Sequence, residues 1–307
     1  MKIELIKNNF IDKGKYDHCI ENAHYGTIYA LSWYLDIVAP NWDLLATSDY
    51  SFVMPLPRKK KWGIGYALQP PLCQQLGIFS EQTVTEAIFC KFIERIPDRY
   101  CILQLNPGNF FPNDSITLKK NYILPLFQPY EEIRASYRVS KRQDLKNTAK
   151  KNLFLNVDVK LSDFLFLIDQ HSLHYKSDNI NLLTSEVLRK DNAFIWGIQR
   201  SADSELIAAA FFLHWNNRLY YIISATSPEG RDCRAMHFLI DQLIQKYSQS
   251  KYILDFEGSS ISSVASFYKS FGAVDEGYPL YYKNRLPWPL NLIKKNSDKS
   301  IFYSIFV

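Results

Sequence analysis

The segment 219–247 joins a strand pattern, a polar loop and a helix pattern, and the loop carries groups that can contact an anion. Those groups are Ser227, Gly230, Arg231 and Arg234. A loop that leads into a helix N-terminus presents unpaired backbone N–H groups and the positive end of the helix dipole, which suits a phosphate or pyrophosphate. The sequence therefore suggests an anion site at 227–234. An ordinary surface loop with solvated arginines is the other interpretation, and for the loop alone it is the commoner one.

A second set of cations lies between Arg134 and Lys151. This stretch holds seven basic residues and one acidic residue, Asp144. On a helix, four of the cations would share one face, and these are Arg138, Arg142, Lys146 and Lys150. A row of solvated side chains is the usual explanation of such a pattern. A surface that binds phosphate groups, including those of a nucleic acid, is the alternative.

The composition places the chain among ordinary globular proteins. It has 307 residues, a net charge of +5, 47% hydrophobic residues and 22% charged residues. These values exclude a disordered, collagen-like or low-complexity protein. The 20 Tyr, 20 Phe and 6 Trp predict large cores, because each buried ring removes roughly 150–250 Å² from water. The length suits one large domain or two of about 150 residues, and so small a charge does not by itself indicate a nucleic-acid partner.

The sequence does not indicate a metal-binding protein, a disulfide-rich protein or a membrane protein. The five cysteines are scattered without a Cys-x-x-Cys spacing, so neither a disulfide framework nor a zinc site is expected. His171 and His174 lie three apart without a further ligand set, and we expect no metal site. The first residues lack the apolar stretch of a signal peptide, and runs such as 206–213 are far shorter than the ~20 residues of a membrane-spanning helix. We therefore expect a cytoplasmic protein without stable membrane insertion.

The second half of the chain alternates strand and helix patterns. Strands are predicted at 194–199, 206–215, 219–226, 252–256 and 277–283. Helices are predicted at 161–175, 183–191, 236–247 and 262–271. Asn216 and Asn217 fit a two-residue hairpin turn, because Asn tolerates positive φ, and Gly272 suits the end of the last helix.

The first half repeats this order more loosely. Helices are predicted at 29–38 and 84–96, and strands at 44–47, 51–57 and 100–105. We expect two α/β domains of one topology, with an N-terminal domain over 1–135, a basic connecting helix over 136–158 and a C-terminal domain over 159–286. The tail 287–307 ends in IFYSIFV, and its apolar side chains predict packing on the first domain.

Three stretches resemble the Fem-type branch of the GNAT acyltransferase superfamily, which comprises the peptidoglycan bridge aminoacyltransferases and their relatives. The basic helix between the two Fem domains is similar to SKRQDLKNTAKKNLFLNV (140–157). The family's central helix begins where this chain has SPEGRDCRAMHFLIDQLIQ (227–245), and its terminal strand–helix with the ending FK..FG is similar to DFEGSSISSVASFYKSFGA (255–273). The resemblance covers most of 25–283. It implies two tandem GNAT-like (acyl-CoA N-acyltransferase) domains with mixed α/β sheets, in which the strands beside the central helix hold an acyl donor.

The resemblance also implies the substrates. Acetyl-CoA users carry a Gln/Arg-x-x-Gly-x-Gly/Ala turn, and this chain has Arg234 at the first of those glycines, which favours the aminoacyl-tRNA donor of the Fem branch. Acyl-CoA stays open as the co-substrate, and no tightly bound cofactor is implied. The donor-binding residues would be Ser227, Gly230, Arg231 and Arg234. Arg138 and Arg142 would bind phosphates of tRNA or of the acceptor, a small-molecule or cell-wall-precursor amine.

Acyl transfer to an amine needs a deprotonated amine, a polarised carbonyl and a proton donor for the leaving group. Asp255 and Glu257 lie two apart on a predicted strand and would face one side, as bases or as caps of the next helix. We favour a cap for Asp255 and leave Glu257 open between the two. Lys269 is either a charge stabiliser or a solvated lysine, and Tyr268 is expected in the core. Glu257 and Lys269 are thus the catalytic candidates.

Three functional hypotheses follow. The first is an N-acyltransferase that moves an acyl or aminoacyl group from a thioester or tRNA donor to a primary amine by direct attack, without metal. The second is a catalytically inactive GNAT-fold binding protein, because Arg234 replaces a glycine and Lys269 lies one residue after the position of the Fem lysine. The third, nucleic-acid binding through 134–151, predicts a steep salt dependence of affinity.

Overall fold

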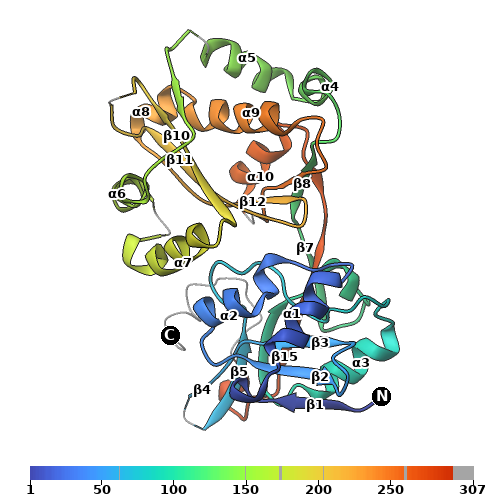
Figure 1. Cartoon of the computed structure of the whole chain (residues 1–307). Coiled ribbons are helices and arrows are strands. Elements are labelled where there is room, and N and C mark those ends of the chain that lie inside the picture. The colour runs from blue at the N-terminus through green and yellow to red at the C-terminus, as the bar shows by residue number, and fades with distance from the viewer. Residues whose placement is uncertain (62, 149, 173–174, 203, 259–260, 293–307) are drawn as a thin grey trace. The chain divides into compact units, whose positions relative to one another are not determined.

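The chain divides into two compact units (Figure 1). Unit 1 comprises Met1–Lys119 and Gly277–Val307, and unit 2 comprises Lys120–Glu276. The computed structural model describes residues 1–61, 63–148, 150–172, 175–202, 204–258 and 261–292. None of the helices in these ranges has the length and apolar character that crossing a membrane requires.

Unit 1 contains two β-sheets and three α-helices among its described residues. The helices are α1 (Lys13–Asn22), α2 (Ser32–Val38) and α3 (Glu86–Arg95). The first sheet has the order β1-β2-β3, with β1 (Ile3–Ile6), β2 (Asp43–Thr47) and β3 (Val53–Leu56). The second has the order β4-β5-β6-β15-β7, with β4 (Arg58–Lys61), β5 (Ile64–Leu68), β6 (Tyr100–Gln104), β15 (Tyr278–Asn284) and β7 (Ile116–Lys119).

Unit 2 is built around one seven-stranded sheet of order β14-β8-β13-β12-β11-β10-β9. Its strands are β8 (Tyr122–Pro125), β9 (Phe154–Asn156), β10 (Ala193–Gln199), β11 (Ala208–Trp215), β12 (Arg218–Thr226), β13 (Ile253–Asp255) and β14 (Val274–Asp275). Its helices are α4 (Tyr130–Ala135), α5 (Val139–Thr148), α6 (Leu161–His171), α7 (Ser177–Arg189), α8 (Pro228–Asp232), α9 (Ala235–Tyr247) and α10 (Ser262–Lys269).

The predicted meander and central helix of unit 2 are confirmed. β10, β11 and β12 pair antiparallel in sequence order, and Asn216 and Asn217 turn with φ of 46° and 61°. The apolar stripe of α9 faces the sheet, where Leu239, Ile240 and Leu243 are fully buried. Figure 1 shows α9 along one face of the sheet and α6 and α7 on the other, so the meander is covered on both sides.

Each unit contains a parallel strand pair followed by an antiparallel strand from a distant part of the chain. In unit 2, β12 and β13 are parallel and β8 pairs antiparallel with β13. In unit 1, β5 and β6 are parallel and β15 pairs antiparallel with β6. The two sheets therefore share one arrangement, and β8 and β15 occupy equivalent places in them.

The unit boundaries differ from the domain limits expected from the sequence, 1–135, 136–158 and 159–286. Unit 2 begins at Lys120 and includes the basic helix, and the strand predicted at 277–283 pairs within unit 1. A strand pattern shows that a segment can pair and which face it buries, but it does not show which sheet receives it. In each unit the free edge of the parallel pair can bind an apolar antiparallel strand, so the pattern of 277–283 fits either sheet.

The start of the C-terminal tail lies with unit 1. Leu290 packs against the cluster formed by Tyr66, Tyr100 and Leu286, and Asn284 donates from Nδ2 to the carbonyl of Asn291 at 3.0 Å. The rest of the tail, including IFYSIFV, lies outside the described residues.

Candidate active site

The strands β12 and β13 separate after three residue pairs. The paired residues are Arg218 with Ile253, Leu219 with Leu254, and Tyr220 with Asp255. β12 is nine residues long and continues to Thr226, whereas β13 ends at Asp255. Among the described residues no strand pairs with 221–226 on this side, which leaves a strand edge that can hold an extended ligand through main-chain hydrogen bonds.

Asp255 fixes the end of β13 at this opening. Its side chain is 2% exposed, and Oδ2 accepts a hydrogen bond from Nη1 of Arg218 at 2.7 Å. Oδ1 accepts from Nδ2 of Asn121 at 3.0 Å and from the backbone N–H of Glu257 at 2.8 Å. These contacts give Asp255 a structural role at the end of β13. The predicted helix cap is wrong, because the N-cap of α10 is Ile261 and, among the described residues, no side chain caps that helix.

Glu257 lies just beyond the strand rather than on it. Its φ is 59°, in the left-handed region, so the strand alternation that would align its side chain with that of Asp255 no longer applies. A left-handed glutamate costs on the order of 1–3 kcal/mol, and such strained residues cluster at functional sites. Its carbonyl accepts the N–H of Tyr122 at 3.3 Å, and its side chain is half-buried.

Tyr268 lies in the aromatic core beside the opening, as expected. Its ring stacks on Phe256 at 4.8 Å and meets Tyr221 edge-on at 6.2 Å, and the residue is 8% exposed. Burial raises the pKa of Tyr268 well above its usual value, with smaller contributions from Tyr221 and Glu257. The phenol therefore stays protonated and can donate a hydrogen bond near Glu257.

Lys269 ends α10 one residue later. Its Nζ lies 5.4 Å from the ring centroid of Tyr122, a cation–π distance, and the backbone N–H of Tyr122 donates to Glu257. The two catalytic candidates thus contact the same buried residue: Glu257 contacts the backbone of Tyr122, and Lys269 contacts its ring.

The loop 227–234 is folded into a helical turn, α8, instead of an open cradle. The Oγ of Ser227 accepts the N–H of Gly230 at 3.0 Å. The N–H groups of Arg231, Cys233 and Arg234 donate to backbone carbonyls within the same turn. Most of the amides that the sequence suggested for an anion are therefore already bonded.

Gly230 serves close packing. A Cβ at this position would lie 2.0 Å from the carbonyl oxygen of Ile207, so only glycine fits. The same Ile207 oxygen accepts the N–H of Ser227 at 2.9 Å. Ser227 and Gly230, which were predicted to bind the acyl donor, thus make structural contacts that hold α8 against the sheet.

The two loop arginines are exposed. Arg231 donates from Nη1 to the carbonyl of Thr226 at 2.7 Å, at the end of β12. Arg234 has φ of 57° and places its Nε 3.7 Å from Oδ1 of Asp144 on α5. Both guanidinium groups remain accessible for an anion at this end of the opening.

The basic stretch is helical over Val139–Thr148, whereas the connecting helix was predicted over 136–158; its last part is wrong, because β9 pairs with β10 over Phe154–Asn156. The arginines of this stretch contact protein. Arg138 lies just before α5 and donates to Oγ of Ser266 on α10 at 3.1 Å. Arg142 donates to the carbonyls of Ala135 and Tyr137 at 2.9 and 3.0 Å, closing the end of α4. Arg138 is thus near the helix that carries Tyr268, whereas Arg142 has a structural role.

Lys141 is the residue that sequence reasoning missed. It belongs to the basic stretch, yet it is 3% exposed, and its Nζ lies 2.9 Å from Nδ1 of His237. A lysine in a basic run is usually solvated. The one signal in the sequence was its position a single turn before Leu145, which shares its helix face and is the buried apolar residue of α5.

Metal ligands do not assemble in the described part of the chain. Its ranges hold no group of three or more His, Cys, Asp or Glu side chains placed to bind a metal ion. His171 ends α6, and His174 lies outside the described residues.

No family model and no curated protein matches this sequence. Solved structures do match in fold, and the structure of FemX aligns with a TM-score of 0.64 at 10% identity, covering 93% of this chain and 98% of that chain. A GNAT-family acetyltransferase from Colwellia psychrerythraea gives 0.54 at 7% identity, with coverage of 92% and 100%. A tandem GNAT protein from the clavulanic acid biosynthesis pathway gives 0.51 at 9% identity, with coverage of 93% and 99%.

The chain therefore has a GNAT-like fold of the Fem type, with two such domains in tandem. At these identities the likeness shows the fold, and the site has to be argued from this chain's own residues.

Proposed function

We propose that the protein is an N-acyltransferase that transfers an acyl or aminoacyl group from a thioester or tRNA donor to a primary amine. The observation that carries this proposal is the early end of the β12–β13 ladder at Tyr220 and Asp255. It opens a strand edge beside a protonated phenol, a strained glutamate and a lysine. An acyl donor bound along this edge would present its carbonyl to Tyr268.

The reaction forms a C–N bond and breaks a C–S or C–O bond. The amine nitrogen attacks the carbonyl carbon, Glu257 accepts the proton that the amine loses, and the leaving thiolate or ribose oxygen takes up a proton. The hydroxyl of Tyr268 donates to the oxyanion or to the leaving group, and Lys269 stabilises the negative charge that develops.

Phosphate groups of the donor would meet the exposed Arg231 and Arg234, which follow the open strand edge. Arg138, beside α10, would serve phosphates of the acceptor or of tRNA. Ser227, Gly230 and Arg142 would support these positions through the contacts that hold α8 and α4. No cofactor needs to be tightly bound, since the donor itself supplies the acyl group, and the acceptor would be a small-molecule or cell-wall-precursor amine.

A donor panel tests the proposal. Acyl-CoAs and charged tRNAs are mixed with the full chain, and both thermal stabilisation and acyl transfer to amines are followed. We expect one donor class to bind, Arg231→Ala and Arg234→Ala to weaken its binding, and Glu257→Gln to lower turnover while leaving donor binding intact. Lys91→Ala, a change of an exposed lysine on α3 outside the basic stretch, is the matched control. No donor binding, with the arginine variants indistinguishable from wild type, would refute the acyltransferase.

Two observations favour a binding protein of the same fold. The amides of α8 are bonded within the turn, and Lys269 already lies over the ring of Tyr122. In this second candidate a donor would bind without turnover, and binding would survive both Glu257→Gln and Lys269→Ala.

A further inference from the structure

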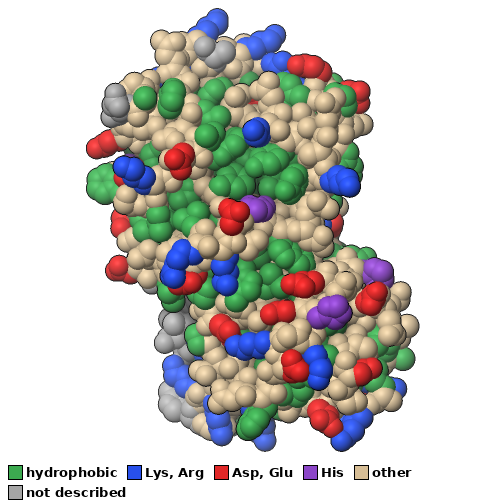
Figure 2. All heavy atoms as spheres, in the orientation of Figure 1, with side chains coloured by type: hydrophobic (Ala, Val, Ile, Leu, Met, Phe, Trp, Pro, Cys, Tyr) green, Lys and Arg blue, Asp and Glu red, His purple; other side chains and the backbone are tan. Residues whose placement is uncertain are grey.

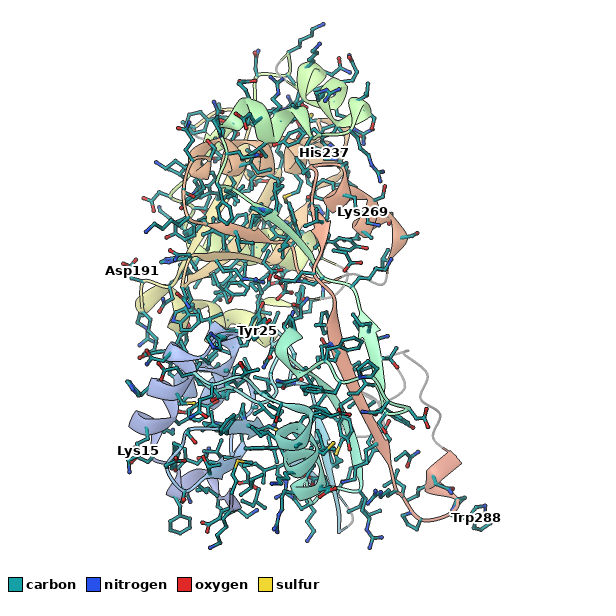
Figure 3. All side chains as sticks on the ribbon, turned by 90° about the vertical axis from the view of Figure 1, so that its right-hand side faces the viewer. Lys15, Tyr25, Asp191, His237, Lys269 and Trp288 are labelled. Carbon is teal, nitrogen blue, oxygen red and sulfur yellow. The ribbon has the colours of Figure 1, made fainter. Side chains whose placement is uncertain are left out.

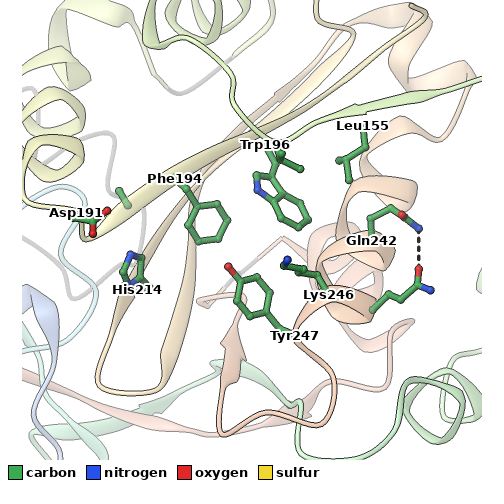
Figure 4. Close-up of a pocket in the computed structure, with 11 residues that line it drawn as sticks. Leu155, Asp191, Phe194, Trp196, His214, Gln242, Lys246 and Tyr247 are labelled. Carbon is green, nitrogen blue, oxygen red and sulfur yellow. Dashed lines mark hydrogen bonds between the residues drawn. The ribbon is translucent and has the colours of Figure 1, made fainter. Parts of the chain in front are cut away.

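Unit 2 has a pocket of about 580 Å³ that the candidate active site does not use. It lies where β9, the start of β10 and the last turns of α9 meet (Figure 4). Its volume is in the range of about 300–1,000 Å³ that is typical of small-molecule sites. Figure 2 shows a broad apolar patch on this face of unit 2, with histidine and acidic side chains at its edge.

The pocket lies two strands away from the start of the strand opening. Phe194, which lines the pocket, pairs with Phe212, and Phe212 pairs with Tyr221, where the opening begins. At about 4.8 Å between neighbouring strands, these two positions are roughly 10 Å apart. Figure 3 shows Asp191 and Lys269 on opposite sides of unit 2, so the pocket and the catalytic candidate Lys269 are approached from different sides.

Three aromatic rings form one wall of the pocket. Tyr247 lies nearly parallel to Phe194 at 6.2 Å and 26°, and to Trp196 at 6.4 Å and 29°. Because the rings stack on one another, a flat ligand cannot enter between them, and a ligand has to pack over the wall. This geometry suits a ligand that presents an apolar face to the outer side of the wall.

The other wall is polar and of mixed charge. Asp191 and Lys246 are exposed and His214 is half-buried, and none of the three makes a salt bridge within the described ranges. Gln242 adds a side-chain amide, whose Nε2 donates a hydrogen bond to Oε1 of Gln245 at 3.3 Å (Figure 4). Opposite charges of Asp191 and Lys246 select neither a cation nor an anion, but together the groups supply hydrogen-bond donors and acceptors.

We propose that this pocket binds a neutral saccharide. A pyranose ring has a C–H face that packs on aromatic rings, and its hydroxyl groups both donate and accept hydrogen bonds. It would place that face over Phe194 and Tyr247. Because Asp191 and Gln242 lie at opposite ends of the pocket (Figure 4), one ring would direct hydroxyls to one of these ends and to Lys246, and a β-linked disaccharide would reach both. A neutral ligand of this kind satisfies both charged side chains without adding an unpaired charge.

Titration of the full chain tests this site. Glucose, galactose, N-acetylglucosamine and their β-linked disaccharides are titrated by calorimetry and saturation-transfer NMR, with choline and adenosine as a cation and a planar base. We expect at least one saccharide to bind saturably. Phe194→Leu, which keeps apolar volume but removes the ring, and Asp191→Asn, which tolerates the φ of 55°, should each weaken binding about tenfold.

Lys246→Met should also weaken binding, and Lys251→Met, a change of an exposed lysine outside the pocket, is the matched control. Urea unfolding of each variant separates lost binding from lost folding. Absence of saturable saccharide binding, equal affinity in wild type and folded Phe194→Leu, or preference for choline or adenosine would each overturn the proposal. Because donor binding is assayed separately, this test is independent of the proposed transferase activity.

Discussion

The Nζ of Lys141 lies 2.9 Å from Nδ1 of His237, inside the interface of three helices. The same ammonium lies 4.5 and 4.2 Å from the ring centroids of Phe267 and Phe271. A buried amine in contact with a basic nitrogen and two rings has little solvent to stabilise its charge. The pKa of Lys141 therefore differs between the folded and the unfolded chain.

Burial lowers the pKa of Lys141 to about 7, and Arg234 contributes in the same direction, while Asp144 and Asp241 oppose the shift. Burial, followed by Lys141 and Arg234, lowers the pKa of His237 to about 3. Near neutral pH, His237 is thus neutral and can accept a hydrogen bond from Lys141.

The first prediction is that stability rises with pH between 7 and 8. The unfolded chain keeps Lys141 protonated up to its usual pKa of 10.5, whereas the folded chain loses that proton near 7. The unfolded state therefore binds more protons in this window, and the free energy of unfolding increases by up to about 1.4 kcal/mol per pH unit. Lys141→Met should remove this slope.

Urea unfolding at pH 7, 7.5 and 8 measures it. Above about pH 8 the thiols of Cys19 and Cys101 act in the opposite direction, because they begin to lose protons in the unfolded chain while burial raises their pKa in the folded chain, so the comparison stays below that limit. Lys146→Met, an exposed position on α5, should keep the wild-type slope. Equal slopes in wild type and Lys141→Met would contradict the prediction.

A second prediction concerns Gly230. An added Cβ would meet the carbonyl of Ile207 at 2.0 Å, so Gly230→Ala must displace α8 from the sheet and should cost about 3 kcal/mol. The control is Gly14→Ala on α1, where the nearest atom is 3.5 Å away and alanine should be neutral or stabilise by up to about 1 kcal/mol. Chemical denaturation compares the two, and the prediction fails if Gly230→Ala is as stable as wild type.

A third prediction concerns the ion pair that ends β13. Asp255→Asn removes the charge that the half-buried Arg218 faces at 2.7 Å. Because Glu276 still pairs with Arg218, the free energy of unfolding should fall by about 2 kcal/mol. Glu186→Gln breaks a surface pair with Arg189 and should change it by less than about 0.5 kcal/mol. Matching effects of the two substitutions would rule out a structural role for Asp255.

A fourth prediction tests Tyr268 in the proposed reaction. Tyr268→Phe keeps the ring that stacks on Phe256 but removes the proton donor, so kcat should fall about 100-fold while the melting temperature is unchanged. Because the pKa of Tyr268 is raised, its contribution should persist through pH 10. Tyr252→Phe is the matched control, and an unchanged kcat in folded Tyr268→Phe would exclude the phenol from catalysis.

Local patterns in the sequence predict the elements well. The apolar runs 206–215 and 219–226 and the Asn pair between them define the β11–β12 hairpin, and the 3.6-residue stripe beginning at Met236 defines α9. These features depend on neighbours close in the chain, so the sequence contains them directly. The short strand β8 was not predicted, because four residues carry too little pattern to distinguish a strand from a loop.

The amino-acid sequence by itself determined the mixed α/β class, the order of elements in the second half and the segments that hold the candidate site. Tertiary structure alone decided that β15 pairs in unit 1, that the amides of α8 bond internally, and that Lys141 is buried against His237. Each of these depends on which distant segments meet. Whether a side chain is solvated or buried depends on which distant segment packs against it, and the local periodicity of the sequence does not encode these long-range contacts.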